Sequence, residues 1–110
     1  MENASLATLA DEHLKIARQA SSGRSAHTVY GGQEHILRQT LVALRSGTLM
    51  DEHENPGEAT IQVLRGQVTI NAGEANLTGS AGDLLIVPQA MHSLTAEDDS
   101  VILLTVAKHR

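Results

Sequence analysis

Histidine is the residue type with the most chemistry to offer in this chain, which has six His and no Cys. The absence of Cys excludes disulfides, Cys-ligated zinc and a thiol nucleophile. His53 lies in the acidic run Asp51-Glu52-His53-Glu54, and His92 follows a strand-like segment that ends at Pro88. Imidazole and oxygen ligands suit Zn, Fe, Mn, Ni or Cu, and residue type alone does not choose among these metals. In the alternative interpretation, His53 is an ordinary loop residue and His92 hydrogen-bonds the backbone.

Polar residues within an otherwise apolar strand form a second candidate group. Because side chains alternate along a strand, either His35 and Gln39 or the opposite set with Arg38 points into the fold. Arg38 and Arg45 are candidate anchors for a carboxylate through bidentate pairing. We expect the strand 35–45 to lie at a sheet edge, where its polar groups meet solvent or a second subunit.

One helix and a series of short strands must position these residues. Residues 4–20 carry apolar side chains at helical spacing, and Asn3 is the predicted N-cap. From residue 26 onward, segments rich in Val, Ile, Leu and Thr are separated by Gly or acidic turns, as is typical of strands. The predicted strands are 26–30, 35–45, 59–65, 67–72, 75–78, 83–87, 91–96 and 101–107. Several are apolar on both faces, which indicates a sandwich or a closed barrel.

Length and charge limit the domain organisation and the kinds of partner that we expect. The 110 residues fit one domain, which we divide into a helix and linker (1–24) and a barrel (25–110). A net charge of −5 with eight Lys and Arg shows no basic stripe, so we expect no nucleic-acid partner. No secretory signal and no membrane-length apolar run is evident, so we expect a cytoplasmic protein without a membrane partner. The aliphatic surplus of 35–45 and 101–107 predicts an apolar patch covered in a homodimer.

Two glycine-framed stretches carry a resemblance to a known family. The first contains Gly47, His53, Glu58 and Gly66, and the second contains Gly82, Asp83, Pro88 and His92. In this order they resemble the two cupin motifs, and the resemblance covers residues 26–107. It implies an all-β cupin fold, a jelly-roll barrel of six to eight antiparallel strands after a short N-terminal α-helix.

The resemblance also implies a metal site inside the barrel. Cupins hold a divalent metal with two His and one Glu of the first motif and one His of the second. His53 and His92 correspond to two of these ligands, although His92 comes one residue early. Asn55 stands in place of the second His, and Ala59 in place of the Glu. Glu58 is also one residue early, which turns a strand side chain to the other face unless a bulge redirects it.

The candidate site residues are His53, His92 and Glu58 for a metal, and Gln62, Asn55 and Arg38 for a ligand. Three function classes remain open. The first is a protein that binds a small molecule in the barrel cavity, with a divalent transition metal as a candidate cofactor. The second is a metal-dependent enzyme (an oxygenase, isomerase or lyase) that acts on a small organic substrate. The third is a non-catalytic accessory or regulatory protein.

Overall fold

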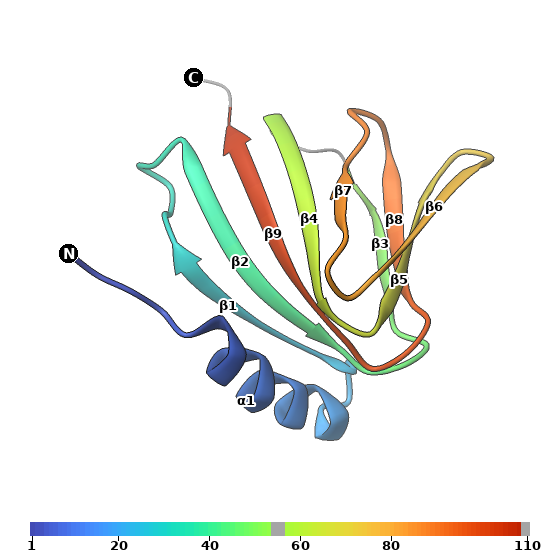
Figure 1. Ribbon diagram of the computed structural model, residues 1–110. Coiled ribbons are helices and arrows are strands. Elements are labelled where there is room, and N and C mark those ends of the chain that lie inside the picture. Colours follow the sequence, from blue (N-terminus) through green and yellow to red (C-terminus); the bar gives the residue numbers. More distant parts are fainter. Residues whose placement is uncertain (54–56, 109–110) are drawn as a thin grey trace.

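The computed structural model describes residues 1–53 and 57–108, which form two facing β-sheets and one helix (Figure 1). The elements are α1 (Leu6–Gln19), β1 (Arg24–Tyr30), β2 (Leu37–Leu44), β3 (Leu49–His53), β4 (Gly57–Arg65), β5 (Gln67–Ala72), β6 (Ala75–Ser80), β7 (Leu84–Ile86), β8 (His92–Ala96) and β9 (Ser100–Lys108). One sheet has the strand order β1-β2-β9-β4-β7, and the other has the order β3-β8-β5-β6. Neighbouring strands pair antiparallel, and the two sheets are not closed into a continuous barrel in the part of the chain that is described.

An aliphatic core fills the space between the two sheets. It contains Val42, Leu44, Ala59, Ile61, Val63, Val68, Ile70, Leu85, Val87, Leu94, Ala96, Ile102 and Val106. Strand β4 shows how the sequence builds this layer, because buried Ala59, Ile61 and Val63 alternate with more exposed residues. The period of two places one face of each strand inward and the other outward. We refer to these as the inner and outer faces of each sheet.

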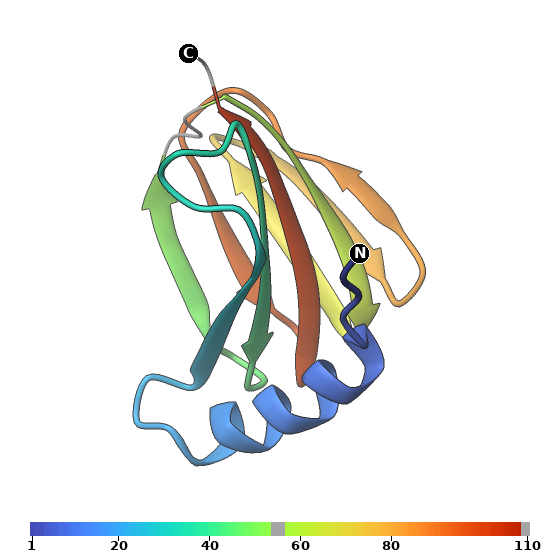
Figure 2. The same cartoon turned by 90° about the vertical axis from the view of Figure 1, so that its left-hand side faces the viewer.

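Helix α1 covers part of the outer face of the larger sheet. Its buried stripe of Ala10, Leu14 and Ala17 packs with Leu41, Ala43 and Val101 in a second, separate apolar cluster. Figure 2 shows the helix lying across this side of the strands. Within the described residues, no helix combines the length and apolar character needed to span a bilayer.

The structure confirms the predicted cupin-type all-β fold and corrects three details. Helix α1 begins later than expected because Ser5, and not Asn3, is the N-cap, and its hydroxyl accepts a hydrogen bond from the Thr8 N–H at 3.2 Å. The described residues contain nine strands, one more than the upper prediction, because the acidic segment Leu49–His53 forms β3. Strand β2 is not at an edge, since it lies between β1 and β9.

Gly66, the last residue of the first motif, forms the turn between β4 and β5. Its φ is 78°, a conformation that favours glycine. A Cβ at this position would meet the carbonyl oxygen of Asp99 and the side chain of Ser100. The first motif therefore ends at a glycine because both the backbone conformation and the space require one.

Candidate functional site

The two histidines of the motifs lie opposite each other in the smaller sheet. Strands β3 and β8 pair antiparallel, and the register makes His53 the Cα partner of His92. A register irregularity separates this pair from Met50, which pairs with Leu94. The backbone positions that sequence analysis selected, far apart in the chain, are thus neighbours across two strands.

His92 is buried, with 3% of its surface exposed, on the same face of β8 as Leu94 and Ala96 of the inter-sheet core. Its Nδ1 lies 2.8 Å from the carbonyl oxygen of Ala90. A carbonyl oxygen only accepts, so Nδ1 is the donor of this hydrogen bond. The alternative interpretation of His92, in which its ring hydrogen-bonds the backbone, is confirmed. A hydrogen bond of this kind also orients the ring of a metal-binding histidine.

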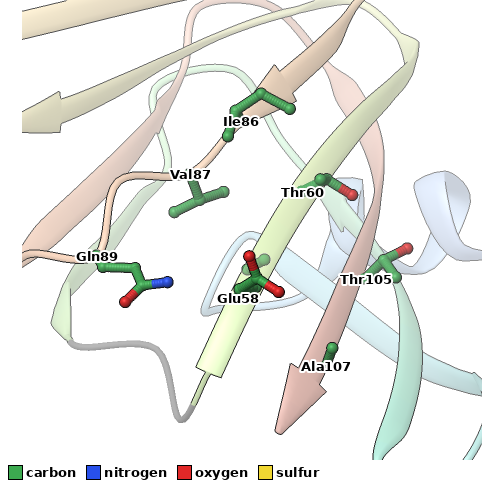
Figure 3. Close-up of a pocket in the computed structure, with 8 residues that line it drawn as sticks. Glu58, Thr60, Ile86, Val87, Gln89, Thr105 and Ala107 are labelled. Atoms are coloured by element: carbon green, nitrogen blue, oxygen red, sulfur yellow. The ribbon is translucent and has the colours of Figure 1, made fainter.

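Of the other two first-motif candidates, Asn55 is not described by the structure and Glu58 is on the opposite face of its sheet from the inter-sheet core. Glu58 is exposed on the outer face of β4, and the adjacent Ala59 occupies the inner face. Glu58 lines an outer groove of about 430 Å³, which Figure 3 shows together with Thr60 and Gln89. No bulge turns Glu58 inward, since the pairing of β4 with β9 is regular from Gly57 to Val63.

Gln62 and Arg45 also lie away from the inter-sheet space. Gln62 is exposed on the outer face of β4. The Arg45 guanidinium donates hydrogen bonds to the carbonyl oxygens of Arg18 and Ala20, both at 3.1 Å. Because those carbonyls lie at the end of α1, Arg45 caps the helix and does not face a ligand.

A metal of the family type requires three or four protein ligands. Among the described residues, no group of three or more His, Cys, Asp or Glu is placed to hold a metal ion. Ala59 contributes a methyl group at the place where the resemblance implies a glutamate. The described side chains therefore do not complete the ligand set, and His92 is the member of it whose side chain the structure describes.

Arg38 is placed differently, on the inner face of the larger sheet. It lines a hollow of about 430 Å³ whose walls come from β1, β2, β3 and β9. The lining residues are Arg24, Ala26, Thr28, Arg38, Thr40, Val42, Met50 and Leu104. Val42 belongs to the inter-sheet core, and Met50 and Leu104 pack against it. The hollow therefore lies between the sheets, beside the open edge formed by β1 and β3.

Sequence analysis named one residue of this hollow, Arg38, as a candidate site residue. It placed Arg24 in the linker before the first strand and proposed no function for Thr28 or Met50. The alternation of Arg24, Ala26 and Thr28 is a signal that would have found two of them. It becomes visible only when the strand begins at Arg24, as β1 does.

Comparison with known proteins supports the fold. No family model and no curated protein matches the sequence. Among solved structures, a conserved protein of unknown function from Streptococcus pyogenes is 23% identical, with a TM-score of 0.72 over 86% of this chain and 85% of that chain. A cupin superfamily protein from Desulfitobacterium hafniense is 16% identical, with a TM-score of 0.71 over 78% of each chain.

An enzyme is also among the structural neighbours. Salicylate 1,2-dioxygenase from Pseudaminobacter salicylatoxidans is 20% identical, with a TM-score of 0.72 over 91% of this chain. The match covers 33% of the dioxygenase chain. The fold of the present protein is therefore that of a cupin, a scaffold shared by enzymes and by proteins of unknown function, and the fold by itself assigns no activity.

Proposed function

We propose that this protein binds a small organic molecule in the hollow on the inner face of the larger sheet, which we call the inner hollow. The observation that carries the proposal is its position and size. It lies between the sheets, and its volume of about 430 Å³ is within the usual range of about 300–1,000 Å³ for ligand sites. Apolar side chains and a few polar groups share its lining, which is the usual composition of such sites.

A thermal-shift screen of small organic acids, sugars and phenols tests this proposal, followed by calorimetry of the hits. The discriminating variant is Ala26→Trp, which puts an indole into the hollow from an exposed position on edge strand β1. The matched control is His27→Trp, which places the same side chain on the other face of β1. Binding that Ala26→Trp abolishes and His27→Trp retains supports the proposal. Equal binding by both variants contradicts it.

Metal-dependent catalysis is a second candidate function, and the His53–His92 backbone pairing favours it. The Nδ1 hydrogen bond of His92 orients the ring as it does in metal sites. A divalent ion bound there would polarise a substrate or activate water. Elemental analysis of the purified wild-type protein and of His53→Ala tests this function. A transition metal that purifies with the wild type and is lost in the variant would support this function, and no metal above trace in the wild type would remove its basis.

A further inference from the structure

The inner hollow carries positive charge in a chain that is acidic overall. Its charged lining residues in the described part of the chain are two arginines, Arg24 and Arg38, whereas the net charge of the chain is −5. Among the side chains that the structure describes, neither guanidinium forms a salt bridge. The salt bridges found among these side chains are Arg18–Asp99 and Arg65–Asp11. An anion that enters the hollow therefore meets two cations that are not neutralised by a described carboxylate.

Of the two arginines, Arg38 is better placed to pair with the carboxylate of a ligand. Its side chain is half-buried, whereas Arg24 is exposed. Its cross-strand partner on β9 is Val106, which belongs to the inter-sheet core. A guanidinium beside an apolar surface is less screened by water, so a paired carboxylate gains more there than at an exposed arginine.

The register places no carboxylate in the row of described residues that contains Arg38. Val106 pairs with Arg38 on one side and with Ala59 on the other, so the three residues form one row across the inner face. Neighbouring strands are about 4.8 Å apart, which puts the Arg38 and Ala59 backbones about 10 Å apart. The side chains of an Arg at one position and a Glu at the other are together long enough to meet across that distance. Ala59 is the position where the cupin resemblance implies a metal-ligating glutamate, so the residue that would have neutralised Arg38 is replaced by a methyl group.

The remaining lining residues indicate which other chemical groups a ligand of the hollow should have. Thr28 and Thr40 are direct cross-strand partners, and their side chains line the hollow next to Arg38. Met50 and Leu104 form apolar wall on the β3 and β9 sides. The hollow thus offers a cation, two hydroxyl groups and an aliphatic surface.

We infer that the inner hollow binds a small organic carboxylate, whose carboxylate group pairs with the Arg38 guanidinium and whose apolar body contacts Met50 and Leu104. This inference rests on the proposed function and names the chemical class of its ligand. The planar guanidinium donates two parallel N–H bonds to a carboxylate, which is the geometry that distinguishes a carboxylate from its neutral amide.

Matched pairs of ligands test the inference directly. We would measure by calorimetry the binding of benzoate, phenylacetate and hexanoate, each beside its primary amide, to the wild-type protein. We expect at least one acid to bind about tenfold more tightly than its amide, and to weaken as salt concentration rises. In Arg38→Gln the acid should bind no better than the amide. In Arg38→Lys, which keeps the charge without the bidentate fork, the preference should be intermediate.

Lys15→Gln is the matched control, because it removes one positive charge from an exposed position on α1, outside the lining of the hollow, and should retain the preference. Circular dichroism and a thermal melt of each variant establish that the fold is kept. Amides that bind as tightly as acids, or acid binding unchanged in Arg38→Gln, would overturn the inference and leave the proposed function standing. If neither acids, amides nor the other compounds of the screen bind the wild type, both are refuted.

Discussion

The docking of α1 can be tested by one substitution, Leu14→Ala. Leu14 is 6% exposed and lies in the centre of the buried stripe of the helix. It belongs to the cluster that includes Leu41 and Val101, on the outer face of the larger sheet. That cluster is separate from the inter-sheet core, so the substitution removes packing beneath the helix and leaves the inner hollow intact.

The expected cost follows from the atoms removed. Leu→Ala deletes three carbon atoms, and at about 0.8 kcal/mol for each buried carbon the lost transfer free energy is about 2.4 kcal/mol. A partly relaxed cavity adds to this value, and we expect about 3 kcal/mol in total, inside the usual range of about 2–5 kcal/mol for this change. For a domain of this size, the loss corresponds to a decrease in Tm of about 13 °C.

Urea unfolding followed by far-ultraviolet circular dichroism measures this change in the free energy of unfolding. Ile16→Ala is the matched control, because Ile16 lies on the same helix and is 53% exposed. We expect the control to change stability by less than about 1 kcal/mol. A loss below about 1 kcal/mol in Leu14→Ala, or equal losses in both variants, would refute the docked arrangement of α1.

Three further predictions concern other parts of the fold. Hydrogen bonds from the Arg18 side chain and then from the Ser46 backbone lower the pKa of Asp99. The ionised form of Asp99 therefore stabilises the folded state above about pH 4, and this contribution is lost as the pH falls through the folded-state pKa. In urea titrations, Asp99→Asn should therefore lose less stability than the wild type between pH 7 and pH 3. Gly66→Ala should lower the free energy of unfolding by about 1–3 kcal/mol, because Gly66 has a φ of 78°, and an unchanged urea midpoint would contradict the turn. We expect the outer face near β7, where Ile86 is 66% exposed, to be covered in a homodimer, so light scattering should report a dimer for the wild type and a monomer for Ile86→Lys.

The glycine frames explain why the fold was predictable from the sequence. Gly66 adopts a left-handed conformation between β4 and β5, and Gly82 does so before β7. Pro88 comes just after β7, as its missing N–H requires. These positions are imposed by the backbone, so they can be recognised without knowledge of the side-chain packing around them.

The candidate site was less predictable because its residues depend on register and on which face becomes covered. The acidic run Asp51-Glu52-His53-Glu54 has a sequence that is typical of a loop. Residues Leu49–His53 form a strand because they pair with β8. The pattern in 35–45 is apolar on both faces, so it does not tell whether Arg38 or Gln39 points inward. The helix resolves this ambiguity, since it packs on Leu41 and leaves the Arg38 face for the inter-sheet space.

The row of Arg38, Val106 and Ala59 connects the departure from the cupin motif with the chemistry proposed for the inner hollow. A glutamate at position 59 would place a carboxylate on the inner face, where it would serve a metal ion or neutralise Arg38. With alanine there, the same face keeps a cation and an apolar surface, which favours an organic anion. The reverse substitution, Ala59→Glu, should therefore abolish the preference for carboxylates over amides, because the new side chain competes for Arg38. Carboxylate binding that survives this change in a folded protein would show that Arg38 and position 59 do not share one site.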